Sequence, residues 1–415
     1  MDIPKKTFLF FPVEIGLAHI VRSLALAEEL YSRGHKIFFA LPQRKRELFK
    51  SSPINFVNIE PYLKNDSINL EVFSNIDFLK NKVIEEIEII EKYKPDAIIV
   101  DFRFSAMASS LIKNIPTFCI MVGNAMPYGS YLPNTGLSRW QYILSKPFLG
   151  IFQTLAFLNY LKPIKKVLHK YNIGTSFKKW FRKMNYIIPE PDFYLTPRDK
   201  KLNYYHTGFI AWKGFNVSAP EWIKNINPDG KTVYLTFGGT GFDKGKLISL
   251  ANTLVDKGYR VVVSTSTIAD PEDFPKKNGL FVARFLPGEE MSRRVDIVIC
   301  HGGYGTMMDA IRGGAPILAI PFNADQIIHS ARMQELGIAR NLGSLKIFDL
   351  KAAFLFDWKY FEKKAKKIEI VFIVSELRRM FKNIEKYKES IKNFNEKYPN
   401  FDGAKQVADI IENKV

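Results

Sequence analysis

The segment HGGYGTMMDAIRGGAPILAIPFNADQ, which begins at His301, places a histidine and several glycines directly after an apolar run. A strand, a glycine turn and a helix in this order leave unpaired N–H groups and the positive end of a helix dipole at the turn, which suits a phosphate. Gly302, Gly303 and Gly305 let the backbone approach that phosphate closely, His301 can donate a hydrogen bond to it, and the helix is expected to open near Thr306. The segment therefore predicts a site for phosphate.

Two acidic residues and an amide follow this turn. Asp309 lies one helical turn past Thr306 and either accepts hydrogen bonds from ribose hydroxyls or is an ordinary solvent-facing residue. Asp325 and Gln326 open the next helix, where Asp325 is either an N-cap or, together with Gln326, a source of acceptors and donors for sugar hydroxyls.

A second glycine turn, GGTG, contains Gly239 and Thr240 and ends the apolar run KTVYLTF. Two such turns in one half fit the rule that ligands bind at the carboxyl ends of strands in open α/β sheets. No GxGxxG follows the first strand and no GxxxxGK[ST] occurs, which disfavours a dinucleotide oxidoreductase or a P-loop enzyme. No D-x-D pair occurs either, so we expect N–H groups and side chains, rather than a metal, to neutralise the phosphates.

A histidine and a carboxylate mark the first half. His19 follows the first apolar run, TFLFFP, and Asp101 ends the later run DAIIVD. Both are expected at the carboxyl edge of one sheet, where a histidine backed by a carboxylate can act as a general base. The alternative is a loop histidine that only caps the following helix.

The elements that must position these residues are strands alternating with helices in both halves, which predicts parallel, doubly wound sheets. At 415 residues the chain exceeds one ordinary core, so we expect two domains. The expected boundaries are an N-terminal domain over 1–205, a C-terminal domain over 206–382, and helices over 383–415 that pack back on the N-terminal domain. The linker is expected within 195–216, where proline, glycine and polar residues cluster.

The composition favours anionic partners and a reducing compartment. The formal net charge is +18, and the only cysteines are Cys119 and Cys300. Glu14 interrupts the first apolar run, and no cleavage site follows, so this run predicts a strand rather than a signal peptide. We expect a cytoplasmic protein.

The interval between Asp101 and Glu190 contains no Asp or Glu but twelve basic residues, with aromatic residues interleaved. This mixture is typical of a helix that lies in a membrane interface, and it is equally compatible with a solvated basic face beside an ordinary core. The basic residues are Arg103, Lys113, Arg139, Lys146, Lys162, Lys165, Lys166, Lys170, Lys178, Lys179, Arg182 and Lys183.

The run from FLPGEEMSRRVDIVICHGGYGT to NADQIIHSARMQELGIAR resembles the donor-binding signature of UDP-sugar-dependent glycosyltransferases with the two-domain GT-B architecture. The most similar group is glycosyltransferase family 1, with its macrolide- and glucuronosyl-transferring relatives. IGLAHIVRSLALAEELYSRGH, PDAIIVDFRFSAMASSLIKNIPT and FDGAKQVADIIE are similar to other family segments in the same order. Only about 131–189 lacks a clear resemblance, in the region where acceptor-binding loops vary. The resemblance implies two Rossmann-like domains that face a cleft.

For the donor, the resemblance implies that His301 and the turn through Thr306 bind the diphosphate and that Asp325 and Gln326 hold the sugar. Phe285 would stack on the base. Asp309 stands where the family usually has a glutamate for the ribose, and Gly288 replaces a common glutamine.

For catalysis, the resemblance implies that His19 is the base and that Asp101 orients it, with Ala18 in place of a family glycine. The expected activity is inverting, metal-independent transfer of a hexosyl group from a UDP-sugar to an acceptor hydroxyl, with no cofactor besides the donor. A lipid acceptor at the inner face of an anionic membrane fits the basic interval.

Three alternatives stay open. One is a soluble transferase that glycosylates a small aglycone, and another is an epimerase or donor hydrolase on the same fold. The third is a non-catalytic, basic nucleotide- or nucleic-acid-binding protein on a degenerate transferase fold. His19 and Asp101 argue against the third, and no nucleic-acid-binding module is recognisable, so no nucleic acid is expected.

Overall fold

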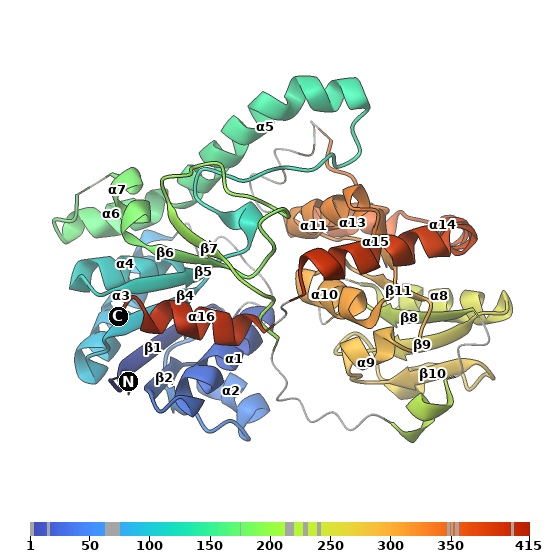
Figure 1. Ribbon diagram of the computed structural model, residues 1–415, viewed down its shortest axis with the longest axis horizontal. Helices are drawn as coiled ribbons and strands as arrows, with labels where there is room; N and C mark the ends of the chain where they lie inside the picture. Colours follow the sequence, from blue (N-terminus) through green and yellow to red (C-terminus); the bar gives the residue numbers. More distant parts are fainter. Residues whose placement is uncertain are drawn as a thin grey trace. The chain divides into compact units, whose positions relative to one another are not determined.

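The protein folds into two compact units, shown in a computed structural model that describes residues 4–14, 17–62, 75–174, 176–211, 220–226, 231–238, 242–346, 349, 352, 357–399 and 402–415 (Figure 1). Unit 1 contains residues 1–131, 148–215 and 400–415, and unit 2 contains 132–147 and 216–399.

Unit 1 is built on a seven-stranded parallel sheet with the order β3-β2-β1-β4-β5-β6-β7. Its strands are nearly continuous apolar runs, as expected for parallel strands covered on both faces. They are β1 (Thr7–Pro12), β2 (Lys36–Ala40), β3 (Asn55–Val57), β4 (Ala97–Asp101), β5 (Thr117–Ile120), β6 (Asn185–Ile188) and β7 (Asn203–His206).

Helices cover both faces of this sheet (Figure 1). One core lies under α1 and α16, and a second lies under α3, α4, α6 and α7. The helices of unit 1 are α1 (Ala18–Ser32), α2 (Gln43–Arg46), α3 (Ile76–Tyr93), α4 (Phe104–Lys113), α6 (Lys162–Lys170), α7 (Phe177–Lys183) and α16 (Gly403–Glu412). The long helix α5 (Arg139–Tyr160) begins in unit 2 and continues into unit 1.

Unit 2 repeats the design with a six-stranded parallel sheet in the order β10-β9-β8-β11-β12-β13. Its strands are β8 (Thr232–Thr236), β9 (Arg260–Ser264), β10 (Leu280–Ala283), β11 (Ile297–Cys300), β12 (Ile317–Ala319) and β13 (Ala339–Asn341). Its helices are α8 (Lys244–Asp256), α9 (Gly288–Ser292), α10 (Tyr304–Gly313), α11 (Ala324–Glu335), α13 (Trp358–Lys366), α14 (Ile370–Lys382) and α15 (Ile384–Lys397). The main core packs α8 and α14 against the sheet.

The expected α/β class with two doubly wound sheets is confirmed, but two expected segments divide differently. The linker expected within 195–216 contains β7, which pairs with β6 and extends the first sheet. The C-terminal helices expected over 383–415 are split, because α15 belongs to unit 2 and only α16 belongs to unit 1. Short polar-flanked strands such as NYYH look like loop in sequence, since their pairing partners decide the structure.

The helix α16 packs against α1 (Figure 1). Arg33, just past the end of α1, lies 2.6 Å from both Asp409 and Glu412, and the buried His35 lies 2.8 Å from the same Glu412. Val407 and Ile411 complete the core beneath α1.

Among the described residues, no helix is both long enough and apolar enough to cross a bilayer. The apolar stretch that ends at Leu161 lies within α5 and the residue after it.

Candidate functional site

Each sheet has a switch point, where neighbouring strands lead to connections that run in opposite directions. In unit 1 this point lies between β1 and β4, and in unit 2 it lies between β8 and β11. Ligands of open α/β sheets bind at the carboxyl ends of such strands. His19 and Asp101 lie at the first switch point, and Gly238 and His301 lie at the second.

At the switch point of unit 1, His19 Nδ1 lies 2.7 Å from Oδ1 of Asp101. His19 lies in the first turn of α1 rather than in the loop before it, and Asp101 is the last residue of β4. The N-cap of α1 is Leu17 and no side chain caps the helix, so the alternative of a capping histidine is wrong. The Phe102 ring stacks on the His19 ring, with centroids 5.5 Å apart.

This contact shows which ring nitrogen of His19 donates. An ionised carboxylate only accepts hydrogen bonds, so Nδ1 of His19 is the donor to Asp101. Asp101 is fully buried. Burial alone would raise its pKa, but the Arg22 guanidinium and His19 outweigh that effect, and the pKa of Asp101 is lowered. The site is therefore an imidazole whose Nδ1–H is held by an ionised carboxylate, which is the arrangement of a general base.

Arg22 is a third member of this group that the sequence analysis did not identify. Its Nε and Nη2 atoms lie 2.5 Å from Oδ2 and Oδ1 of Asp101, respectively, and the hydroxyl of Ser23 donates to the same carboxylate. The spacing of three residues from His19 places both side chains on one face of α1. That spacing was the available signal, and it pairs the buried negative charge with a fixed positive one.

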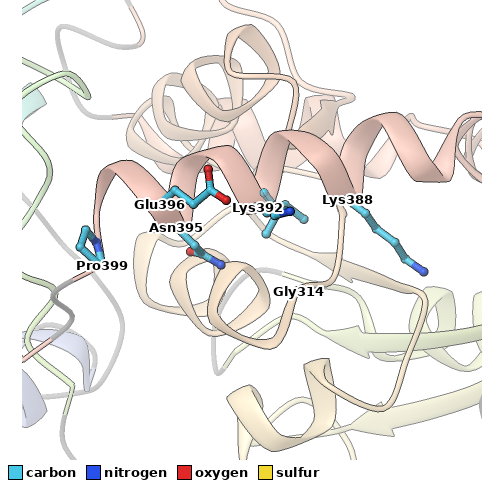
Figure 2. Close-up of a pocket in the computed structure, with 7 residues that line it drawn as sticks. Gly314, Lys388, Lys392, Asn395, Glu396 and Pro399 are labelled. Atoms are coloured by element: carbon cyan, nitrogen blue, oxygen red, sulfur yellow. The ribbon is translucent and has the colours of Figure 1, made fainter.

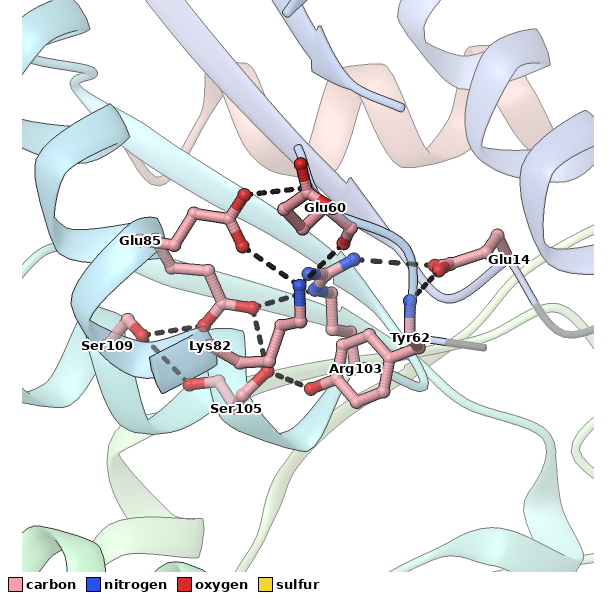
Figure 3. Close-up of polar contacts among 9 residues, drawn as sticks. Glu14, Glu60, Tyr62, Lys82, Glu85, Arg103, Ser105 and Ser109 are labelled. Carbon is pink, nitrogen blue, oxygen red and sulfur yellow. Dashed lines mark hydrogen bonds and ion pairs between the residues drawn. The ribbon is translucent and has the colours of Figure 1, made fainter. Parts of the chain in front are cut away.

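A second buried charge cluster lies beside the connection from β1 to α1 (Figure 3). Arg103 donates to Glu86 over 2.7 Å and lies 3.5 Å from Glu14, which follows β1 and also accepts the backbone N–H of Tyr62. Ser105 and Ser109 of α4 both donate to Glu86. The Arg103 guanidinium lies 4.4 Å from the Tyr62 ring centroid. Arg103, one of the twelve basic residues of the acid-free interval, is therefore an internal anchor rather than part of a basic surface.

In unit 2 a glycine corner, formed by Gly302 and Gly303, follows β11. Gly302 has φ +79°, and a Cβ at this position would lie 2.1 Å from the hydroxyl of Ser330. Only glycine fits both restrictions. The helix α10 begins directly after the corner, at Tyr304 rather than at the expected Thr306, and no side chain caps it. Its first N–H groups are therefore directed toward the corner, where an anion would be stabilised.

Two buried polar atoms at this corner have no hydrogen-bond partner among the described residues. They are Nδ1 of His301 and Oγ of Ser330. Burial lowers the pKa of His301 to about 4, against the opposing effects of the Thr236 backbone and Asp325. His301 is therefore neutral at pH 7. Unpaired buried polar atoms beside a helix N-terminus are the features expected where a polar ligand completes the hydrogen bonding. Ser330 was missed in the sequence because it lies on α11, well after the glycines.

The second glycine turn is only partly described. Gly238, two residues after the end of β8, has φ +64°, and a Cβ there would lie 3.3 Å from the His301 ring. Gly239 and Thr240, the two residues of this turn proposed for phosphate binding, lie outside the described residues.

The residues proposed for the donor sugar lie at the start of α11. The N-cap is Asn323, whose side chain accepts the N–H of Gln326, so the interpretation of Asp325 as an N-cap is wrong. Gln326 is buried and its Oε1 accepts the N–H of Phe322 over 2.8 Å, which leaves its NH₂ group to donate. The Asp325 side chain is 53% exposed and lies 3.5 Å from the His329 ring.

The residues proposed for the nucleoside surround the start of α9. Burial raises the pKa of Asp309 to about 7, with Arg312 lowering it and Glu289 raising it further. A Cβ on Gly288 would lie 2.5 Å from Oδ2 of Asp309, so the carboxyl occupies the space that any side chain at 288 would need. Asp309 in place of the family's glutamate and Gly288 in place of its glutamine are thus physically linked. Phe285 is exposed, as a ring that stacks on a base would be.

A separate groove of unit 2 lies away from these residues, between α15 and the end of α10 (Figure 2). It contains none of the proposed site residues. Its lining residues are Gly314, Lys388, Ile391, Lys392, Asn395, Glu396 and Pro399. Among the described residues, no three His, Cys, Asp or Glu side chains gather as metal ligands would. Both cysteines are buried and unpaired with each other.

Known proteins match the chain in both sequence and fold. Residues 247–351 match the family model described as Glycosyltransferase family 28 C-terminal domain. A PGL/p-HBAD biosynthesis glycosyltransferase of Mycobacterium tuberculosis is 25% identical over 346 residues, covering 80% of each chain. A PGL/p-HBAD biosynthesis rhamnosyltransferase of Mycobacterium bovis is 25% identical over 351 residues, covering 80% of this chain and 76% of its own.

Solved structures reproduce the fold over nearly the whole length. The spinosyn rhamnosyltransferase SpnG, complexed with spinosyn aglycone, superposes with a TM-score of 0.69 at 14% identity, covering 98% of this chain and 99% of its own. The glycosyltransferase VinC in complex with DTDP superposes with a TM-score of 0.65 at 15% identity, covering 99% and 100%.

The fold therefore places the chain in the two-domain GT-B class, as the resemblance implied. The protein is a glycosyltransferase that uses a nucleotide-sugar donor and a hydroxyl acceptor, and its C-terminal part matches the family 28 model. The interpretation as a non-catalytic binding protein is set aside.

Proposed function

We propose that the protein transfers a hexosyl group from a UDP-sugar to a hydroxyl of a lipid acceptor, with inversion at the anomeric carbon and without a required metal ion. The observation that carries this proposal is the pairing of the buried Asp101 carboxylate with His19 at one switch point, while the other switch point presents an uncapped helix and unpaired polar atoms.

His19 acts as the base. Its Nε2 lone pair takes the proton of the acceptor hydroxyl as the oxygen attacks the anomeric carbon. Asp101, already ionised, stabilises the imidazolium that forms and keeps Nδ1–H oriented. Arg22 is a positioning residue that holds both oxygens of Asp101. Attack from the face opposite the leaving group inverts the anomeric configuration.

The leaving diphosphate receives the electron pair of the broken C–O bond. The N–H groups at the start of α10 and the neutral His301 meet the negative charge that develops there, which lowers the barrier without metal participation. Gly302 keeps the corner open to the phosphates, and Gly239 and Thr240 are proposed to contact them from the second turn.

Donor recognition is assigned to the residues around this corner. Asp325 and Gln326 bind hydroxyls of the sugar, Asp309 faces the ribose and Phe285 stacks on the base. Since one relative is named a rhamnosyltransferase and VinC was solved with DTDP, TDP-linked deoxyhexoses belong beside UDP-sugars among the donors to be tested.

The acceptor is proposed to be a lipid, reached by peripheral contact with the inner face of an anionic membrane. The acid-free interval between Asp101 and Glu190 supports this location, because its cations favour an anionic surface. A small soluble aglycone is the competing acceptor, because the structural neighbour SpnG was solved with the spinosyn aglycone.

A panel of UDP- and TDP-sugars tests the proposal directly. Nucleotide release is measured with and without a lipid acceptor carrying a free hydroxyl, and NMR of the product gives the anomeric configuration. We expect release to depend on the acceptor, to persist in EDTA and to give the inverted product. A retained configuration would refute the mechanism, loss of activity in EDTA would refute metal independence, and release that ignores the acceptor would identify a donor hydrolase.

A further inference from the structure

The long helix α5, labelled in Figure 1, carries an exposed apolar stripe over residues 140–155. The stripe consists of Trp140, Leu144, Phe148, Ile151 and Leu155, whose exposed fractions range from 56% to 75%. These residues recur every three or four positions, so they share one face of the helix. Ile143, 49% exposed, lies at the border of this face.

Other positions of α5 make its packing contacts. On the side opposite the stripe, Tyr142 donates to the Leu132 carbonyl over 2.6 Å and the Phe157 ring lies 5.6 Å from that of Phe181. At the edge of the stripe, Thr154 donates to the Tyr128 carbonyl over 3.1 Å. The stripe is therefore not the surface that attaches α5 to its own chain. Because α5 is one uninterrupted helix, the stripe is a property of the helix itself.

The acid-free interval that contains the stripe also carries exposed cations. Three of the twelve basic residues of the interval are engaged by carboxylates, since Arg103 contacts Glu86, Lys113 contacts Glu91 and Arg182 contacts Asp199. Eight of the other nine are exposed, and Lys165 is half-buried. These nine are Arg139, Lys146, Lys162, Lys165, Lys166, Lys170, Lys178, Lys179 and Lys183.

We propose that the stripe of α5 inserts into the headgroup region of an anionic lipid bilayer, with the lysines of α6 and α7 bound to the anionic headgroups. An exposed apolar helical face that contains a tryptophan, in a segment rich in exposed lysines, is typical of an interfacial helix that lies along a membrane. Contiguous exposed apolar surface of this kind marks an interaction site. The inference deepens the proposed lipid-acceptor function by naming the surface that reaches the membrane.

A second copy of the chain is disfavoured as the occupant. A symmetric dimer through the stripe would bring the same patch of each copy together, and therefore lysines against lysines. No acidic residue occurs between Asp101 and Glu190 to offset that repulsion.

Vesicle co-sedimentation with the full chain tests the inference. The vesicles are phosphatidylcholine alone or phosphatidylcholine with phosphatidylglycerol. We expect binding only to the anionic vesicles, and quenching of Trp140 fluorescence by brominated lipid, measured as the difference between the wild type and W140F. The triple variant W140Q/L144Q/F148Q should lower the partition coefficient at least about tenfold. K162Q/K166Q should lower it by about fivefold for each lysine.

Matched controls come from unit 2. V371Q/F372Q removes two exposed apolar side chains of α14, and K386Q/K388Q removes two exposed lysines of α15. Both controls should bind vesicles as the wild type does. Circular dichroism and melting temperature confirm that each variant is folded.

Several outcomes overturn the inference. They are no binding by the wild type, binding that the stripe variants do not weaken, and equal loss in the controls. A dimer in light scattering that W140Q/L144Q/F148Q dissociates would assign the stripe to a second copy instead. Donor release without vesicles is the independent readout of the proposed function. A wild type that releases nucleotide but ignores vesicles refutes only the membrane contact, and one that binds vesicles but transfers no sugar refutes only the proposed function.

Discussion

Unit 1 gathers charged side chains where β1 and β4 end, whereas unit 2 gathers backbone groups and a neutral histidine where β8 and β11 end. The two sheets present the same kind of switch point, yet Asp101, His19 and Arg22 form a network of contacts at the first, while His301 Nδ1 and Ser330 lack partners among the described residues at the second. A base must be held in one tautomer before the substrate arrives, so its site is complete in itself. A site for phosphate keeps hydrogen bonds available for the ligand.

The largest expected effect separates the two switch points. H19A should lower kcat by about three orders of magnitude, because the general base is lost, while leaving UDP affinity within about twofold. Transfer kinetics and calorimetric titration with UDP give the two values. H301A should instead weaken UDP binding more than H19A does.

H169A, which removes an exposed histidine of α6, is the control for these substitutions. If H19A kept wild-type turnover, the assignment of His19 as the general base would be wrong.

The next effect sharpens the comparison at the glycine corner. G302A combines a left-handed φ with a methyl group 2.1 Å from Ser330 Oγ, so UDP affinity should fall by about a hundredfold. G258A is a matched control because Gly258 has φ +82° but nothing within 4 Å of its Cβ position. Both variants carry backbone strain, and only G302A should lose UDP in titration calorimetry. Equal affinities in the two variants would contradict the placement of the phosphates.

A smaller effect is expected from Arg22. R22M leaves Asp101 buried without the guanidinium that holds both of its oxygens, so kcat should fall about tenfold with little change in KM, and R22K should restore part of the loss.

The same variant tests the stability that Asp101 contributes. The pKa of Asp101 is lowered in the fold, so its ionisation stabilises the fold above the unfolded pKa of 3.8, and that contribution is lost as the pH falls below 3.8. The difference in melting temperature between wild type and R22M should therefore shrink on acidification. A constant difference from pH 7 to pH 3 would exclude this linkage.

The smallest effect concerns Asp309. Its pKa is raised to about 7, so the folded state binds a proton that the unfolded state releases above pH 3.8, and stability should fall as the pH rises from about 4 to 7. One proton changes the free energy of unfolding by at most about 1.4 kcal/mol for each pH unit. The observed slope should be smaller, because the Asp309 side chain keeps some exposed surface. D309N should lack this slope in melting curves recorded across that range. Parallel curves for the two proteins would show that Asp309 is ionised in the fold.

Much of the architecture was predictable because parallel strands covered on both faces are long apolar runs. The strand expected at TFLFFP is β1, with the same bounds. NYYH was not expected as a strand, because its strand depends on pairing with β6. His19 and Asp101, far apart in sequence, were brought together by the edge rule for parallel sheets.

Contacts set by rotamers were beyond the sequence. Arg22 was missed because an arginine on a helix is usually a surface residue. The link between Gly288 and Asp309 was also missed, because only the coordinates show that the Asp309 carboxyl fills the space a side chain at 288 would need. The basic interval was recognised as a composition, but its apolar face on α5 and the internal position of Arg103 required coordinates.

The placement of α16 has a consequence for how the chain acquires its structure during synthesis. The ribosome completes α1 early, yet the partners of Arg33 and His35 on α16 emerge only after all of unit 2 has been made. The lobe that is started first is therefore finished last, and a nascent chain that stops before residue 403 lacks the packing of Val407 and Ile411 beneath α1. No single cut in the chain releases the two lobes as independent proteins.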